Sequence, residues 1–247
     1  MRLHRFYTTE QINPQSEIVI YSAELVNQIR KVFRLKTGDS VVLFDGLGSD
    51  YECVIDRFGE GSKIKSDNTI FLHVATTKRS AFLPAREIIL CAGIVKRDTF
   101  EWIVEKATEL GVTKIIPIIA ERSEKKALNG VRLKKIAIEA SEQSGRGNVP
   151  EIHPIISLKE AVEWVSAKKI NAVAFHTEGE VLARRDFASE VSPRYQLEVF
   201  IGPEGGWSHD EIDLFHKNKI PVVCLGNQVL RSETAVVSAL SVLVFGN

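Results

Sequence analysis

Cysteine, long apolar runs and a net charge are scarce or absent in this chain of 247 residues. Its three cysteines, Cys53, Cys91 and Cys224, are far apart and share no C-x-x-C spacing, which argues against a zinc site or a disulfide framework. No segment approaches the roughly 18 consecutive apolar residues of a membrane helix, and residues 1–6 lack an apolar signal core. We therefore expect a cytoplasmic protein with no membrane contact, whose cysteines are small buried hydrophobes.

The charges balance, because Lys plus Arg and Asp plus Glu each number 32. Such a chain has no overall field that would attract a polyanion, so any nucleic-acid contact must be local. The hydrophobic content of 44% is sufficient for a packed core. Composition therefore predicts a globular protein with one large or two modest domains.

Several catalytic motifs are also missing. No G-x-x-x-x-G-K-[ST] sequence is present, no strand leads into G-x-G-x-x-G, and no G-x-S-x-G elbow occurs. The six histidines include no H-x-x-x-H pair, so we expect no metal. These absences favour a group-transfer enzyme that holds a reactive cofactor against its substrate and takes little covalent part itself.

The chain divides into two regions of different pattern. Short strand-like runs at 17–21, 40–44, 50–56 and 69–76 surround one helical stretch at 23–33, which predicts a small β-barrel domain over residues 1–76. Residues 77–85 contain a proline and no clear period, and are interpreted as a linker that opens the second domain, 77–247.

In the second region strands and helices alternate, which predicts a parallel α/β domain. Asp98 is expected to cap a helix over 99–110 that Gly111 terminates. The last helix, 233–245, has almost no polar face and should be buried against the sheet, a partner subunit, or both. The expected strands are 87–92, 114–119, 170–175, 197–201 and 222–225, and the other expected helices are 131–144, 158–167 and 209–217.

Two glycine-bearing runs follow strands of this domain. Ile201 to Ser208 and Leu225 to Ala235 both precede helices, so each is a loop at the carboxyl end of a strand, where open α/β sheets bind ligands. Ser208 and Glu211 fit a capping box at the start of the helix that follows the first run. The two loops predict a pocket, although either one alone is also explained as an ordinary turn.

Four stretches together resemble one family, the bacterial 16S ribosomal RNA uridine-N3 methyltransferases of the small-subunit methyltransferase E group, in the SPOUT superfamily. They are Lys96 to Val112, Glu139 to Arg146, Gly202 to Ser208 and Leu225 to Ala235. The resemblance implies a trefoil-knotted SPOUT domain with a parallel sheet after a PUA-like β-barrel, S-adenosylmethionine as methyl donor, and a homodimer. In one departure from the family pattern, Gln228 and Val229 stand where a basic residue and an isoleucine are more common.

The resemblance also implies the site. Three loops would bind the cofactor, over residues 175–179, 201–205 and 225–230. The expected cofactor-binding residues are His176, Thr177, Glu178, Ile201, Gly202, Pro203, Gly205, Leu225, Gly226, Val229, Leu230 and Thr234. Plain core packing is the alternative for the apolar members.

N3 of uridine must lose its proton to accept a methyl group, and the negative charge formed by that loss spreads onto O2 and O4, so a cation or N–H donors are expected near these oxygens. Arg231 and Arg146 are the candidates, with a loop-shaping salt bridge as the alternative for Arg231. Glu233 could accept the N3 proton, but a place at a helix N-terminus explains it better.

Binding to 16S ribosomal RNA in the 30S subunit would use Arg2, Arg5, Arg30, Arg34 and Arg146, with Lys125 and Lys126 as further candidates. A SPOUT enzyme for another RNA, and a non-catalytic ribosome-assembly factor, stay as alternatives. The sequence leaves open which nucleotide is modified, the catalytic base, the dimer geometry, motion between domains, and whether free RNA or only an assembled subunit is the substrate.

Overall fold

The computed structural model describes residues 3–59, 69–84, 86–123, 127–168, 170–181 and 196–245. The chain forms two compact units: unit 1 comprises residues 1–83 with 141–148, and unit 2 comprises 84–140 with 149–247. Segment 141–148 thus belongs to unit 1 although the residues on both sides of it belong to unit 2. The domain division at residues 76 and 77 stays a prediction, since compactness alone does not show where an independently folding domain ends.

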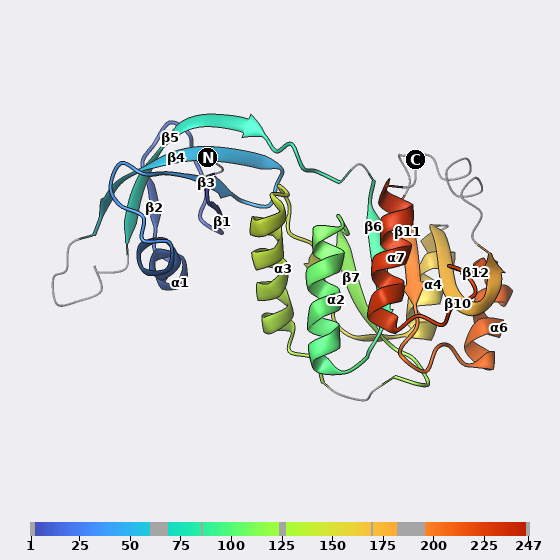
Figure 1. The fold of residues 1–247 in the computed structure, drawn as a ribbon. Coiled ribbons are helices and arrows are strands. Elements are labelled where there is room, and N and C mark those ends of the chain that lie inside the picture. The colour runs from blue at the N-terminus through green and yellow to red at the C-terminus, as the bar shows by residue number, and fades with distance from the viewer. Residues whose placement is uncertain are drawn as a thin grey trace. The chain divides into compact units, whose positions relative to one another are not determined.

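Unit 1 is a curled five-stranded sheet in the order β1-β3-β4-β5-β2 (Figure 1). Neighbouring strands are antiparallel except β1 and β3, which are parallel. Its strands are β1 (Arg5–Tyr7), β2 (Ile18–Ile20), β3 (Ser40–Phe44), β4 (Ser49–Phe58) and β5 (Ile70–Arg79). Buried side chains of these strands, among them Phe6, Ile55 and Leu72, form a core with Ile29 from the helical segment. Alternating burial along β2 and β4 explains why these runs form strands with one face on a core.

The helical stretch expected at 23–33 is present as an α-helix, α1 (Ala23–Asn27), that continues as a π-helical segment, η1 (Gln28–Val32). One prediction for unit 1 is wrong: strand β5 runs to Arg79, so residues 77–79 are not linker. Strand β1 was not predicted from the sequence.

Unit 2 is built on a parallel sheet in the order β12-β10-β11-β6-β7-β8, with β9 also paired to β7. Every neighbouring pair in it is parallel, as the alternating pattern predicts. Its strands are β6 (Ile88–Gly93), β7 (Lys114–Ile119), β8 (Glu151–Ile152), β9 (Ile156–Ser157), β10 (Asn171–Val181), β11 (Leu197–Ile201) and β12 (Val222–Cys224). The two-residue strands β8 and β9 were not predicted.

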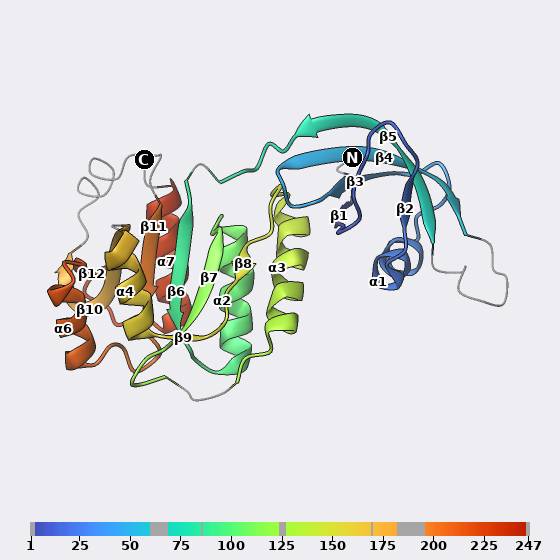
Figure 2. The ribbon, with the colours of Figure 1, turned by 180° about the vertical axis from the view of Figure 1, so that it is seen from behind.

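Helices cover both faces of this sheet (Figures 1 and 2). One core lies between the sheet and α2 (Arg97–Glu109), α3 (Gly130–Ser144) and α7 (Ser232–Phe245). The other lies between the sheet and α4 (Leu158–Lys168) and α6 (His209–Lys217). Strand β11 is buried along its whole length between β10 and β6, which explains why four of its five residues are apolar.

Helix ends test the capping predictions. Ser208 caps α6, and Glu211 returns the second bond of a capping box, which confirms that prediction. The expected Asp98 cap is wrong: α2 begins at Arg97 with Lys96 at its N-cap, so Asp98 lies in the first turn, where an acid is also favourable. Gly111, with a φ of 93°, follows the end of α2 as predicted.

The carboxyl-terminal helix returns across the sheet. Strand β12 lies at the sheet edge beside β10, whereas α7 packs against α2 and β11. Val236, Leu240 and Leu243 of α7 are buried, while Val242 and Phe245 are 38% and 68% exposed. The helix therefore covers the sheet with one side and keeps apolar side chains on its surface.

A carboxyl group is fully buried in the central strand. Glu198 of β11 is 0% exposed, and neither of its side-chain oxygens has a hydrogen-bond partner among the described residues. Burial raises the pKa of this carboxyl to about 7, against the opposing charges of Lys168 and Lys114. The three cysteines are also buried, as predicted, and burial raises the pKa of the Cys53 thiol to about 12.

Candidate functional site

The middle of β10, the loop after β11 and the start of α7 meet in unit 2. The Trp207 indole Nε1 donates to the carbonyl of Phe175 at 3.1 Å, which joins the loop after β11 to β10. The hydroxyl of Ser232 donates to the carbonyl of Gly202 at 2.8 Å and joins the same loop to α7. Both bonds are buried, so they hold residues far apart in sequence in one place.

Glycines allow backbones to approach closely around this place. A Cβ on Gly93, the last residue of β6, would lie 2.5 Å from the backbone nitrogen of Pro203. A Cβ on Gly179 would lie 2.5 Å from the carbonyl carbon of Val223. Because real Cβ atoms essentially never come so close to backbone atoms, these positions require glycine. The backbones of these segments thus pack tightly against one another.

The first expected cofactor loop, 175–179, lies within a strand and does not follow the end of one. Strand β10 does not end at Phe175 but continues to Val181, and His176 to Gly179 form an irregularity in its pairing with β12. The backbone N–H of Glu178 donates to Nδ1 of His176 at 3.2 Å. His176 lies against the second loop, since a Cβ on Gly206 would be 3.7 Å from its Nε2. Thr177 and Glu178 are exposed.

The second loop turns sharply at its glycines. The N–H of Gly206 donates to the carbonyl of Pro203 at 2.8 Å, and Gly206 has a φ of 68°. Ile201, Gly202 and Pro203 are buried, whereas Gly205 is exposed. A β-turn with glycine at a positive φ explains why this sequence folds so.

The third loop holds its apolar residues at different depths. Leu225 is half-buried and packs against the core on the α2 and α7 side, and Leu230 is half-buried. Val229 is 83% exposed. Gly226 has a φ of 149°, which disfavours other residues there, and Thr234 is exposed on the first turn of α7. Core packing therefore explains part of the burial of Leu225. It does not apply to Val229, whose side chain is exposed.

Two of the predicted catalytic residues lie at the start of α7. Arg231 is exposed, and its carbonyl accepts the N–H of Ala235 at 2.8 Å. Glu233 lies in the first helical turn, and its Oε2 is buried without a hydrogen-bond partner among the described residues. The position of Glu233 at the positive end of the helix dipole agrees with the structural role that the sequence favours for it.

The third, Arg146, lies in segment 141–148 and is bound into unit 1. Its side chain is 4% exposed, and both Nε and Nη2 donate to Oδ1 of Asn148 at 3.2 Å. Burial lowers the pKa of its guanidinium to about 10, so it remains charged at neutral pH. The carboxylate of Glu142 accepts the N–H of Tyr7 at 2.9 Å and Nε2 of Gln28 at 3.3 Å.

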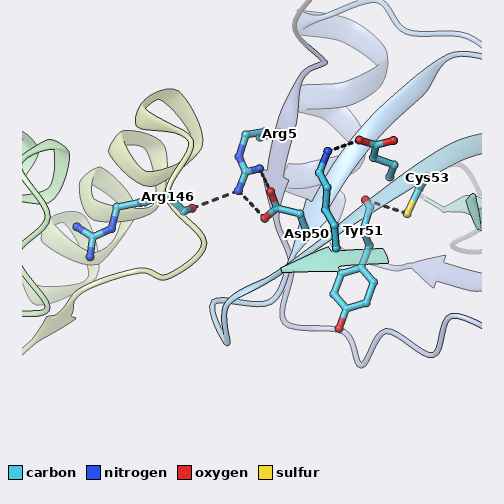
Figure 3. A network of polar contacts seen from close by, with 7 residues as sticks. Arg5, Asp50, Tyr51, Cys53 and Arg146 are labelled. Carbon is cyan, nitrogen blue, oxygen red and sulfur yellow. Dashed lines mark hydrogen bonds and ion pairs between the residues drawn. The ribbon is translucent and has the colours of Figure 1, made fainter. Parts of the chain in front are cut away.

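Arg5 also holds this segment. Figure 3 shows its guanidinium between Asp50 and the main chain of Arg146, whose own side chain points the other way. Nη1 and Nη2 donate to the two Asp50 oxygens at 2.6 and 3.0 Å, and Nη2 also donates to the carbonyl of Arg146 at 3.2 Å. The Arg5 and Asp50 side chains are only 9% and 6% exposed. Arg5 is therefore engaged inside unit 1 and offers little surface to RNA.

The other predicted RNA-binding residues lie differently. Arg30 is exposed, with its guanidinium carbon 5.4 Å from the centre of the Phe58 ring. Arg34 is exposed and has a φ of 55°. Arg2, Lys125 and Lys126 lie outside the described residues.

Among the His, Cys, Asp and Glu side chains of the described residues, no group of three is placed to hold a metal ion. None of the helices in this part of the chain has the length and apolar character needed to cross a membrane.

The residues that join the loops were not predicted from the sequence. Trp207 and Ser232 stand within the recognised motifs, but no pattern indicates that their side chains bond to other loops. Gly93 could have been found as the glycine that ends a buried strand on the ligand-binding side of the sheet.

The fold and the site define the class of protein: a PUA-like unit followed by a parallel α/β unit in which the loops at the ends of strands come together. The family described as "RNA methyltransferase domain" matches residues 83–244, and "RNA methyltransferase PUA domain" matches residues 24–64. The chain therefore belongs to the ribosomal RNA small subunit methyltransferase E family, which confirms the resemblance and the fold class.

Relatives match along nearly the whole chain. The ribosomal RNA small subunit methyltransferase E of Bacillus subtilis is 30% identical over 96% of this chain and 93% of its own length. That of Rickettsia conorii is 28% identical over 98% and 95%. The solved structure of the Neisseria gonorrhoeae methyltransferase E bound to S-adenosylmethionine is 26% identical, with a TM-score of 0.85 over 97% of this chain and 96% of that one. A putative methyltransferase of Legionella pneumophila in complex with the same cofactor is 28% identical, with a TM-score of 0.85 over 98% and 97%.

Proposed function

We propose that this protein transfers a methyl group from S-adenosylmethionine to N3 of a uridine in 16S ribosomal RNA, acting on the small ribosomal subunit. The observation that carries the proposal is the joining of the loops by the Trp207 and Ser232 bonds in a chain of this family. The names of the relatives and the cofactor in two solved neighbours support the same reading.

The residues fit the cofactor. A backbone-lined place at the carboxyl ends of parallel strands can offer N–H and carbonyl groups to an adenine edge and a ribose, and the close approaches at Gly93 and Gly179 make it compact. We assign cofactor binding to His176, Thr177, Glu178, Ile201, Gly202, Pro203, Gly205, Leu225, Gly226, Val229, Leu230 and Thr234. When bound, S-adenosylmethionine supplies an electrophilic methyl group on a sulfonium.

The chain's own residues orient the reactants and stabilise charge. Arg231 is exposed beside the third loop, where its guanidinium can hold the oxygens of a uridine as N3 loses its proton. Arg146 is proposed as the second cation because its guanidinium keeps its charge, although it is buried and bonded to Asn148. For Glu233 the main role in this scheme is to start α7, and proton transfer is its secondary role.

RNA binding is assigned to the exposed arginines of unit 1. Arg30 and Arg34 can meet phosphates directly, and such contacts weaken as salt rises. Arg5 takes part by holding the segment that carries Arg146. We also propose a homodimer formed through α7, because Val242 and Phe245 leave an apolar surface on that helix.

The test uses the purified protein, S-adenosylmethionine and 30S subunits. Titration calorimetry measures cofactor binding, and mass spectrometry of the treated RNA locates the methyl group. We expect cofactor binding and one methyl group at N3 of a 16S uridine. Methylation of another base or of transfer RNA would favour a different RNA substrate, and binding of 30S without cofactor binding would favour an assembly factor.

A further inference from the structure

The loop after β7 forms a rigid turn beside the second cofactor loop, and the three expected cofactor loops do not include it. In this turn the N–H of Ser123 donates to the carbonyl of Ala120 at 3.1 Å, and the Ser123 hydroxyl accepts the N–H of Ala120 at 3.0 Å. The same hydroxyl donates to the carbonyl of Ile118 at 3.4 Å. These bonds fix the two residues in the middle of the turn, Glu121 and Arg122.

Both of these residues are bonded to the segment that follows β11. Nη1 of Arg122 donates to the carbonyl of Gly205 at 2.9 Å and to that of Trp207 at 3.4 Å. The N–H of Glu121 donates to Oε1 of Glu211 at 2.8 Å. Oε2 of Glu211 accepts the N–H of Ser208 at 2.8 Å, so one carboxylate joins the turn to the start of α6.

The contacts of Arg122 flank the one residue of the second loop that has a positive φ. Its two acceptors are the carbonyls of the residues on either side of Gly206, whose φ is 68°. Bonds to a guanidinium are stronger than bonds between neutral groups, so they restrict both peptide planes. A Cβ on Gly205 would lie 3.1 Å from Cβ of Arg122, so the side chain of Arg122 packs on the loop as well as bonding to it.

We propose that Arg122 is a positioning residue for the cofactor site, and that the turn after β7 is a fourth loop of that site. Arg122 holds the Gly205 and Trp207 carbonyls and so presets the backbone that meets S-adenosylmethionine. Glu211 fixes the end of the same loop. This inference rests on the proposed function, since it assigns a role in the binding of that cofactor.

The test compares Arg122→Ala and Arg122→Lys with the wild-type protein. The control is Arg132→Ala, which removes an exposed arginine paired with Glu101 on α2. Calorimetry gives the Kd for S-adenosylmethionine, and steady-state assays with 30S subunits give kcat and both KM values. Losing bonds to a charged donor should raise the Kd about tenfold in Arg122→Ala, and Arg122→Lys should recover part of it. The KM for the cofactor should rise together with the Kd, while the KM for 30S should stay at its wild-type value. The control, Arg132→Ala, should match the wild-type protein in the Kd and in both KM values.

Several results would overturn the inference. An unchanged cofactor Kd in Arg122→Ala would do so, as would a change confined to the KM for 30S and its salt dependence, which would make Arg122 an RNA contact. If Arg122→Ala does not fold, Arg122→Lys decides by the same measurements, because it keeps the charge and most of the packing. No cofactor binding by the wild-type protein would overturn the proposed function itself, and this inference with it.

Discussion

Removal of the buried carboxylate of Asp50 is expected to destabilise unit 1 strongly. Asp50→Ala would leave the guanidinium of Arg5 enclosed at 9% exposure, without the two oxygens that it now contacts at 2.6 and 3.0 Å. Breaking a buried ion pair by removing one partner costs about 3 to 5 kcal/mol, mostly because the remaining charge is left without compensation. The double variant Arg5→Met with Asp50→Leu should recover much of this loss, since it removes both charges.

Hydrogen exchange with mass spectrometry measures this effect where it arises. At about 1.4 kcal/mol per factor of ten, the most protected amides of unit 1 should exchange roughly a hundredfold faster or more in Asp50→Ala. All three tryptophans, Trp102, Trp164 and Trp207, belong to unit 2, so unfolding followed by tryptophan fluorescence reports on that unit separately.

The control is an ion pair of the same geometry on the surface. Glu17 receives two bonds from Arg57, at 2.5 and 3.2 Å, but these side chains are 42% and 54% exposed. Glu17→Gln should leave exchange in unit 1 unchanged, because solvent screens the pair. The reasoning is refuted if Asp50→Ala exchanges like wild type, or if Glu17→Gln accelerates exchange equally.

Three further predictions concern unit 2. Because burial raises the pKa of Glu198 from 4.5 to about 7, its native carboxyl holds a proton that the unfolded one loses, so stability should fall by about 3 kcal/mol as pH rises from 4.5 to 7. In Glu198→Gln, the stability measured by urea unfolding should not decline in this way as pH rises. A pH profile identical to that of the wild-type protein would contradict the prediction. Gly93→Ala should abolish or greatly weaken cofactor binding in calorimetry, since its Cβ would lie 2.5 Å from the Pro203 nitrogen, and wild-type affinity would contradict the packing. Ser208→Ala should lower the unfolding free energy by about 1 kcal/mol through loss of the cap, and an unchanged urea midpoint would disprove this.

The sequence predicted elements well where a period or an end signal is strong. Alternation of strands and helices identified the parallel sheet, and Ser208 with Glu211 located the start of α6. It failed where local signals compete. Asp98 is a good cap by type, yet the helix starts earlier, and the strand expected to end at Phe175 resumes after an irregularity that pairing with β12 imposes.

The site could be predicted in outline only. Loops after parallel strands point to the ligand edge, but which loops touch is decided by long-range bonds such as Trp207 to Phe175. The expectation of a knotted tail came from the resemblance alone, since patterns by themselves would be drawn as an unknotted sheet. Likewise Arg5 is a basic residue near the N-terminus in sequence, and only the fold shows that Asp50 neutralises it.

The central claim is that three distant loops form one cofactor site, and hydrogen exchange with and without S-adenosylmethionine tests it most directly. The account predicts that peptides covering 174–179, 202–208 and 225–231 slow together over the same cofactor concentrations. Slowing in one of these segments only, or in none, would contradict it.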